Sequence, residues 1–336
     1  MTIPRGEILK KLNDQAKQGI PIIGGGAGTG ISAKSEEAGG IDLIVIYNTG
    51  RYRMAGRVSL TGLFAYSDAN TVMMEMAAEV LPVVRRTPVL AGVNATDPFR
   101  LMSQFLEQVK GMGFSGVQNF PTVGLFDGIM RENMEATGLG YDKEVEMIRL
   151  AHEMDLLTTP YCFTEDEAQA MVKAGADMIV AHVGLTTGGT IGATAAMTMD
   201  QAIDTTMRIA EAARAIRKDI LVICHGGPFD EPENVAAAMQ RMPGINGFYG
   251  ATSMERLPVE RAIKEQVEKF KLFVRSFFEQ PREIVLKSSN ELQIGTFRVH
   301  KREAFHAVHW KDGRKQRDLS LFLGVSYLGC LHEVTN

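Results

Sequence analysis

Hydrophobic positions in this chain fall into two alternating patterns. Short, nearly continuous apolar runs are typical of parallel strands that are buried on both faces. Between them lie stretches in which apolar residues recur every three or four positions, as in amphipathic helices. The runs predict eight strands, at Pro21–Gly24, Ile41–Tyr47, Pro88–Val93, Gly116–Asn119, Leu156–Cys162, Asp177–His182, Ile220–His225 and Ile245–Tyr249.

The helical stretches carry recognisable start signals. Thr164 stands directly before one of them, and prolines at positions 98, 232 and 258 suit a first helical turn. Besides an N-terminal helix, the pattern predicts helices at Asp68–Arg85, Pro98–Met112, Asp142–Met154, Glu165–Ala174, Met199–Arg217 and Pro258–Leu272.

Alternation of eight strands with helices predicts an α/β fold, the closed (β/α)8 or TIM barrel. The pattern covers residues 1–273, which we assign to the barrel domain. Residues 274–336 do not continue it and form a short C-terminal extension for which we predict no structure.

The predicted loops after strands two, four and six are long, at residues 49–67, 120–141 and 183–198. Loops of more than about a dozen residues in a compact domain are usually functional. On the carboxyl side of one barrel, three such loops would form a lid over its mouth. The third loop contains the Gly- and Thr-rich stretch Leu185–Ala196, which fits a mobile flap or a static cover.

Composition excludes several classes of partner. The 336 residues are 45% hydrophobic and 23% charged, with a net charge of −4. No basic excess indicates binding to nucleic acid or to an anionic membrane. No apolar run is long enough to span a bilayer, and the N-terminal segment does not resemble a signal peptide. We therefore expect a cytoplasmic protein without nucleic-acid or membrane partners, and a homo-oligomer remains open.

Candidate chemistry lies at the carboxyl ends of the strands, where such barrels carry their active sites. Glycine-rich turns follow strands seven and eight, and turns of this kind hold phosphate through backbone N–H groups. Arginines after strand two would neutralise an anion. The residues expected to bind a small anionic ligand are Gly25, Gly26, Asn48, Arg51, Arg53, Asn94, Asn119, Gly226, Gly227, Gly250, Ala251 and Ser253.

Two histidines, His182 and His225, end adjacent strands and should be neighbours at the mouth. Histidine is the side chain best suited to proton transfer near neutral pH. The pair fits either an acid/base role or two satisfied core residues. Tyr161, at the end of strand five, is the third catalytic candidate.

No cofactor is predicted. The acids near strand ends, Asp97, Asp127 and Glu255, do not form a clear metal-ligand set, although a divalent ion beside a phosphate substrate remains open. Three widely spaced cysteines predict neither disulfides nor a metal site. GTGISA (Gly28–Ala33) has dinucleotide-binding spacing, but Tyr47 and Asn48 stand where that motif requires an acid.

Seven stretches together resemble the phosphoenolpyruvate hydrolase-like, or phosphonopyruvate hydrolase, family of barrel proteins. They are IPIIGGGAGTGISAK, DLIVIYNTGRYRMAG, GVNATDP, GVQNFPTVGLFDG, AHVGLTTGG, CHGGP and FYGATSMERLP. The resemblance covers about residues 1–273 and implies a TIM barrel related to the indole-glycerol-phosphate synthase group. Similar barrels occur as input domains of some enhancer-binding transcription activators and in a plant antiviral resistance protein.

The resemblance implies hydrolysis of a phosphoenolpyruvate- or phosphonopyruvate-like acid. Together with the strand-end residues it predicts His182 or His225 as the acid/base, glycine-rich turns around the phosphoryl group, and an arginine neutralising the ligand. The alternative is a ligand-sensing barrel in signal transduction without turnover. Catalytic release of phosphate distinguishes the enzyme from the sensor, which shows ligand-induced stabilisation alone.

Overall fold

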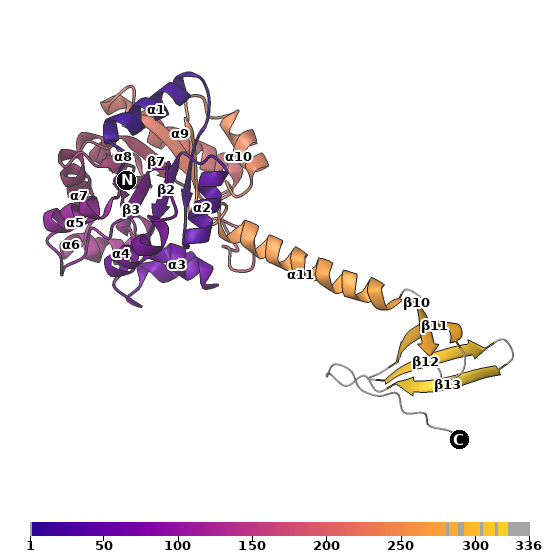
Figure 1. Cartoon of the computed structure of the whole chain (residues 1–336). Helices are drawn as coiled ribbons and strands as arrows, with labels where there is room; N and C mark the ends of the chain where they lie inside the picture. Colours follow the sequence, from indigo (N-terminus) through magenta and orange to yellow (C-terminus); the bar gives the residue numbers. More distant parts are fainter. Residues whose placement is uncertain (1, 280–281, 288–291, 303–304, 313–314, 322–336) are drawn as a thin grey trace. The chain divides into compact units, whose positions relative to one another are not determined.

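The computed structural model describes residues 2–279, 282–287, 292–302, 305–312 and 315–321. The chain forms two compact units, Met1–Glu260 and Arg261–Asn336. In the first unit a parallel sheet is surrounded by helices (Figure 1). Its strands follow the order β5-β4-β3-β2-β1-β9-β8-β7-β6. Their bounds are β1 Ile22–Gly26, β2 Leu43–Ile46, β3 Val89–Gly92, β4 Gly116–Gln118, β5 Leu157–Thr158, β6 Tyr161–Cys162, β7 Met178–His182, β8 Leu221–His225 and β9 Gly247–Gly250.

The two edge strands of this order, β5 and β6, are halves of one extended segment. Between them, the Thr159 amide donates to the Val117 carbonyl at 3.1 Å, and the Pro160 carbonyl accepts from the Val180 amide at 2.9 Å. These bonds join the segment to β4 on one side and β7 on the other, so the sheet closes. Pro160 has no N–H for the ladder, which interrupts the predicted fifth strand. The prediction of an eight-stranded β/α barrel is confirmed.

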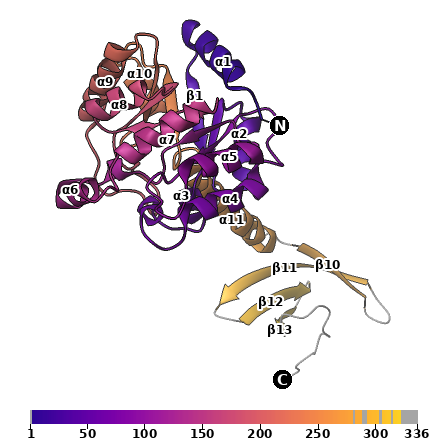
Figure 2. The same ribbon diagram turned by 90° about the vertical axis from the view of Figure 1, so that its left-hand side faces the viewer.

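Helices connect successive strands around the outside of the barrel (Figure 2). Those of the first unit are α1 Arg5–Lys17, α2 Gly30–Ala38, α3 Asn48–Met54, α4 Ala69–Val80, α5 Met102–Met112, α6 Gly128–Ala136, α7 Asp142–Glu153, α8 Glu165–Lys173, α9 Met199–Ile216 and α10 Pro232–Met239. Short 3-10 helices, η1 Ser59–Leu63 and η2 Val123–Leu125, lie in the long loops after β2 and β4.

Alternate residues of each strand face two different hydrophobic clusters. In β2, Leu43 and Val45 point into the barrel, whereas Ile44 and Ile46 pack against the surrounding helices. All four are fully buried. This explains why the strands appear as unbroken apolar runs rather than as alternating patterns.

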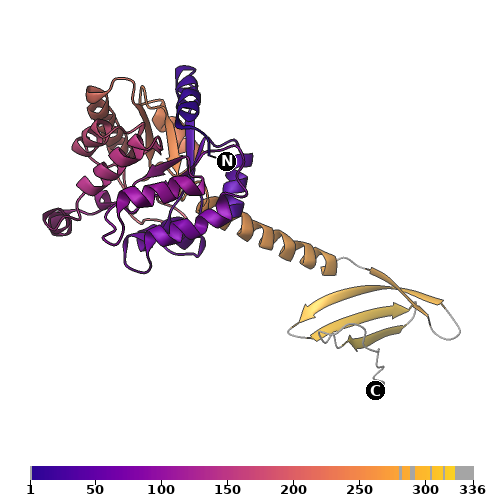
Figure 3. The ribbon, with the colours of Figure 1, turned by 60° about the vertical axis from the view of Figure 1, so that its left-hand side comes forward.

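Helix α1 closes the amino end of the barrel. Its Ile8 and Leu12 belong to the same cluster as the side chains inside the barrel. Helices α1 and α3 lie at opposite ends of the barrel in the first two views, and α1 again stands at one end of the strands in the third (Figure 3). With one end filled, the interior is accessible from the carboxyl ends of the strands.

Several predicted boundaries were wrong. The helix expected from Pro98 begins at Met102, because Asp97 and Pro98 form part of a turn in which the Phe99 amide donates to Asp97 Oδ1. The loop expected directly after β2 contains helix α3, so that Asn48 opens a helix rather than ending a strand. Thr164 does cap α8, accepting a hydrogen bond from the Glu167 amide.

Helix α11 (Arg256–Glu279) runs across the boundary between the two units. The predicted end of the barrel domain at residue 273 stays a prediction. The second unit contains an antiparallel sheet of β10 Arg282–Lys287, β11 Leu292–Arg302, β12 Phe305–Asp312 and β13 Lys315–Leu321, in that order. Among the residues described, no helix combines the length and the apolar character that crossing a bilayer requires.

We expect Gly24→Ala to destabilise the barrel. A Cβ on Gly24 would lie 2.5 Å from the Tyr249 ring inside the barrel, and overpacking of this kind costs about 1–3 kcal/mol. Gly111→Ala is the control, because a Cβ there meets nothing within 4 Å and the residue lies inside α5. The control should gain up to about 1 kcal/mol from helix propensity. Denaturant titration measures both, and equal stability of the two variants would contradict the argument.

Candidate functional site

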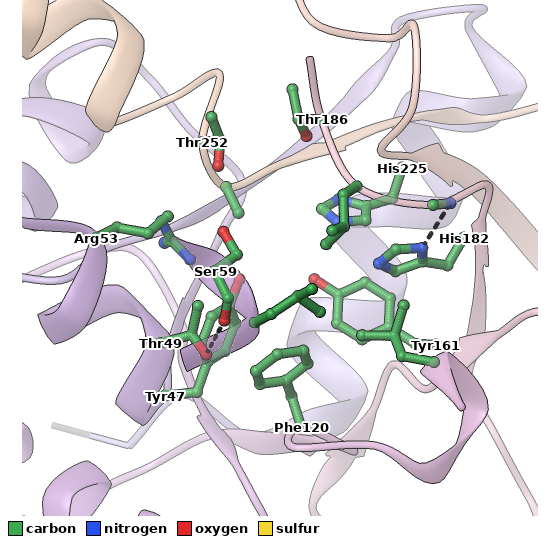
Figure 4. A pocket seen from close by; sticks show the side chains of 15 residues that line it. Tyr47, Thr49, Arg53, Ser59, Phe120, Tyr161, His182, Thr186, His225 and Thr252 are labelled. Carbon is green, nitrogen blue, oxygen red and sulfur yellow. Dashed lines mark hydrogen bonds between the residues drawn. The ribbon is translucent and has the colours of Figure 1, made fainter. Parts of the chain in front are cut away.

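A small pocket lies where all three long loops meet the carboxyl ends of the strands. Its free volume of about 30 Å³ holds about two waters at roughly 10–15 Å³ each. The lining residues are Tyr47, Thr49, Arg53, Ser59, Leu60, Phe120, Leu125, Tyr161, His182, Gly184, Leu185, Thr186, His225, Ala251 and Thr252. The expectation that these loops cover one mouth is therefore confirmed. Arg53 lies on one side of the pocket, and the two histidines lie on the other (Figure 4).

Arg53 is the one lysine or arginine among the residues that line the pocket. Its guanidinium lies 5.4 Å from the centre of the Tyr47 ring, and Nη2 donates to the Gly26 carbonyl at 3.4 Å. The side chain is 2% exposed, so that its charge is shielded from solvent. A cation held in this way attracts an anionic ligand more strongly than a surface arginine would.

Glu255 compensates the buried charge. Its Oε2 lies 3.5 Å from Arg53 Nη2, and its Oε1 accepts a hydrogen bond from the Gly28 amide at 2.6 Å. Burial raises the pKa of Glu255, whereas Arg53 lowers it. Nearby, burial and the charge of Glu255 raise the pKa of Glu36 to about 8. One guanidinium therefore faces two buried carboxyl groups.

The two histidines lie together, as predicted, with ring centres 4.5 Å apart. His225 Nδ1 lies 2.6 Å from the Tyr249 carbonyl, so Nδ1 carries the proton and Nε2 is an acceptor in the neutral ring. His182 Nδ1 accepts from the Gly184 amide at 3.1 Å, so its proton is on Nε2. The backbone thus fixes opposite tautomers in the two rings.

Both rings are neutral at physiological pH. Burial lowers the pKa of His225 to about 4, with a further contribution from the charge of Arg53. Burial and the neighbouring His225 lower the pKa of His182 well below its ordinary value. At neutral pH, His182 offers an N–H donor, and His225 offers a lone pair.

Tyr161 stands beside both histidines, with ring centres 5.0 Å from His182 and 4.9 Å from His225. Burial raises its pKa well above 10, so the hydroxyl keeps its proton. Within the described residues this hydroxyl and the Nε of Arg53 have no hydrogen-bond partner. Buried polar groups are nearly always satisfied, so these two are available to a ligand or to water.

The glycine-rich turns differ from the prediction in one respect. The Gly227 amide donates to the Gly184 carbonyl at 3.0 Å and is therefore unavailable to a phosphate. Gly226 has φ +84°, and a Cβ there would lie 2.1 Å from the same carbonyl. These glycines shape a turn. In the part of the chain that the structure describes, the amides of Ala251 and Thr252 have no acceptor, and both residues line the pocket.

The loop after β7 is fastened over the pocket. Arg256 Nη2 donates to the Gly188 carbonyl at 3.0 Å, and the Thr190 amide donates to Glu260 Oε2 at 3.0 Å. Thr187 Oγ1 donates to Asp230 at 2.8 Å. The Thr190 bond is exposed, and the other two bonds are partly buried.

Of the predicted ligand-binding residues, Arg53 and Ala251 line the pocket, as do the three catalytic candidates, but the others do not. Arg51 points away from Arg53, because two residues on a helix are about 200° apart. It pairs instead with Glu75 at 2.6 Å and Glu79 at 3.2 Å on the surface.

The three predicted asparagines bind protein. Asn48 Nδ2 donates to the Gly62 carbonyl, and the Asn94 side chain accepts from Thr96. Asn119 accepts from the Tyr161 amide and donates to Glu144, a buried carboxyl group. Their short side chains stabilise the loops around the mouth and do not reach the pocket.

The remaining glycines and Ser253 lie around the pocket lining. A Cβ on Gly25 would approach Glu36, and one on Gly26 would lie 3.0 Å from the Tyr47 hydroxyl. Gly250 faces Met254 and Ser253. No pattern in the sequence indicates that Thr49, Ser59 and Thr186 line the pocket, because their position depends on how the loops fold back.

The donors of the described region do not fit a divalent metal. No three His, Cys, Asp or Glu side chains cluster there as metal ligands would. Asp97 is paired with Arg100 and bonded to Asn70, and Glu255 is paired with Arg53.

These features define a class of protein: a parallel β/α barrel with a buried polar pocket at the carboxyl ends of its strands. The family model described as phosphoenolpyruvate hydrolase-like matches residues 7–273. The chain belongs to this family.

Curated relatives include two tomato (Solanum lycopersicum) proteins, ToMV resistance protein Tm-1(GCR237) and ToMV susceptible protein tm-1(GCR26). Each is 61% identical, over 80% and 79% of this chain respectively. The match spans about a third of their length, 35% in each. The protein y4pA of Sinorhizobium fredii, described as a transcriptional regulator, is 33% identical over 80% of this chain and 44% of its own length.

Solved structures share the fold at low identity. Oxaloacetate acetylhydrolase in complex with oxalate aligns with a TM-score of 0.51 and 15% identity, over 80% of this chain and 88% of its own. Phosphoenolpyruvate phosphomutase from Streptomyces platensis subsp. rosaceus aligns with a TM-score of 0.50 and 15% identity, over 80% of this chain and 87% of its own.

The histidine pair should make stability depend on pH. Because both pKa values lie below 6.5, the folded protein binds fewer protons than the unfolded chain between pH 6.5 and about 4. Their stabilisation is present above pH 6.5 and is lost as pH falls, by up to about 1.4 kcal/mol per pH unit for each ring. Denaturant titration across this range should show a shallower pH dependence for His225→Gln than for the natural protein.

Glu36 makes stability depend on pH in the opposite direction. Its raised pKa stabilises the fold below its unfolded value of 4.5, and this is lost as pH rises toward about 8. Glu36 is unchanged in His225→Gln, so the difference between the stability-versus-pH curves of the variant and the natural protein reports the contribution of His225. Parallel pH curves for the two proteins would contradict the assignment of a depressed pKa to His225.

Proposed function

We propose that the pocket binds a small phosphorylated or phosphonate acid, such as phosphoenolpyruvate or phosphonopyruvate, and hydrolyses it. Membership of the phosphoenolpyruvate hydrolase-like family supports the substrate class. The observation that carries the proposal is the pairing of a buried cation, Arg53, with two neutral histidines of opposite tautomers across one pocket.

Arg53 would bind the anion through its guanidinium, whose Nε is unpartnered. The free amides of Ala251 and Thr252, in the turn after β9, would donate to phosphoryl oxygens. The Tyr161 hydroxyl would donate a further hydrogen bond. Charge-assisted bonds of the first kind are about twice as strong as neutral ones, so Arg53 supplies most of the affinity.

Hydrolysis then requires a base and a donor. His225 Nε2 would take a proton from water while the water oxygen forms a bond to phosphorus. The bond from phosphorus to the pyruvate oxygen, or to the pyruvate carbon in phosphonopyruvate, breaks, and its electron pair leaves with the pyruvate enolate. A proton then returns to the enolate, giving pyruvate and phosphate. A bound anion raises the pKa of His225 and so improves it as a base. The N–H of His182 would hold the ligand in place.

The present pocket is too small for such an acid, so the loop after β7 would open for entry. The bonds of Arg256 and Glu260 to this loop would break and re-form in each cycle. Closure would exclude water other than the reacting molecule.

A ligand sensor is the second candidate. It is favoured by the position of α11, whose first turn holds the pocket loop and whose later residues belong to the second unit. The relative y4pA is described as a transcriptional regulator and is longer than the matched region. A sensor would show ligand-induced stabilisation without phosphate release.

Arg53→Gln should weaken binding of phosphoenolpyruvate by at least about tenfold, because a charge-assisted bond contributes about 1.5–3 kcal/mol. Thermal shift against ligand concentration measures the change. Arg51→Gln is the matched control on the same helix, since Arg51 pairs with surface carboxylates. Equal loss in the two variants, or none in either, would contradict the proposed role of Arg53.

His225→Asn should reduce phosphate release by at least about 10², the usual contribution of general acid–base catalysis, with little change in ligand affinity. His182→Asn should have the smaller effect. If His225→Asn lowers the melting temperature but keeps its specific activity, His225 is a core residue. If the natural protein releases no phosphate from any phospho-acid and is still stabilised by ligand, the sensor replaces the enzyme.

A further inference from the structure

The surface of α11 beyond Glu260 carries a line of large apolar side chains. Ile263, Val267 and Phe270 are 61%, 51% and 62% exposed. They are spaced by four and then three residues, and Val274 and Phe277 continue the same spacing in the sequence. Helix α11 extends to Glu279, so all five positions lie on one helix. Contiguous apolar surface of this kind marks an interaction site.

The width of this line indicates what covers it. A helix that packs on a globular core shows an apolar face at least about 100° wide, whereas a two-position seam is typical of a coiled coil. Here Lys264, Gln266 and Lys271 flank the seam, and Phe273, which is 64% exposed, is the one apolar side chain described among the flanking positions. An apolar seam that repeats every seven residues packs against the same seam of a second helix in a coiled coil.

We propose that α11 pairs with α11 of a second copy of this chain in a parallel, two-stranded coiled coil. Val267 and Val274 would occupy the a positions, where β-branched residues favour two strands in parallel coils. Ile263, Phe270 and Phe277 would occupy the d positions.

The charges beside the seam select the parallel orientation. In a parallel pair, the g position of one helix faces the following e position of the other, which places Gln266 opposite Lys271. In an antiparallel pair, e positions face each other, and the lysines at 264 and 271 would meet like charges. Lys264 also lies 3.7 Å from Glu268 within its own helix, on the outer surface.

The full chain tests the pairing directly. Light scattering at micromolar protein should give about twice the chain mass of 36.8 kDa. Phe270→Glu should give the single-chain mass with unchanged circular dichroism of the barrel. Leu272→Glu is the matched control, because Leu272 is 65% exposed but lies off the seam, and it should keep the double mass. A monomeric natural chain, or a dimer that Phe270→Glu leaves intact, overturns the proposal.

Cross-linking tests the orientation. Val267→Cys should form a disulfide-linked dimer under mild oxidation, because like a positions meet in a parallel pair. Leu272→Cys should not. Both variants are made with Cys330→Ser, and the chain carrying Cys330→Ser alone gives the background, since the other two cysteines, Cys162 and Cys224, are buried. A dimer in which Val267→Cys fails to cross-link overturns the parallel coil. A monomer in which Phe270→Glu lowers the melting temperature would show that the seam packs on its own chain.

Discussion

A guanidinium group buried at the carboxyl end of the barrel is the constraint on which the site depends. Removing the Arg53 charge from water is costly, and the surroundings must compensate it. Glu255 supplies the opposite charge and is itself fixed by the Gly28 amide. Three segments far apart in the sequence are thereby tied together: the end of β1, helix α3 and the turn after β9. Burial lowers the pKa of His225, and the charge of Arg53 adds to this effect.

Glycines in β1 make room for this arrangement. Gly24 accommodates the Tyr249 ring, and Gly26 lies against the Tyr47 hydroxyl and Arg53. Larger residues would fill the interior from this side and displace the aromatic rings. The glycine-rich stretch therefore serves packing and the placement of Arg53, and neither Gly25 nor Gly26 is among the residues that line the pocket.

The fold could be predicted because burial on both strand faces leaves a direct signal in the sequence. Leu43–Ile46 is apolar at every position, since alternate side chains face two different cores. The neighbouring positions of His182 and His225 also followed from strand order. The ligand-binding residues were harder to predict, because polar groups at strand ends serve loops as often as ligands. Arg51 and Arg53 look alike in sequence, and the helix that separates them was missed. Asn48, Asn94 and Asn119 bind the backbone or side chains of the protein.

Because the two histidines are fixed in opposite tautomers, the pocket is polar, with a hydrogen-bond donor at His182 and an acceptor at His225. One ring presents a hydrogen and the other a lone pair, and each is fixed by a backbone group that a ligand cannot move. A fully deprotonated, symmetric anion can satisfy the first ring but not the second. Both rings are satisfied when an acceptor atom lies against His182 and an O–H or N–H, of a ligand or of a water molecule, lies against His225. The backbone around His182 and His225 thus sets which side of the pocket presents a hydrogen-bond donor and which side presents an acceptor.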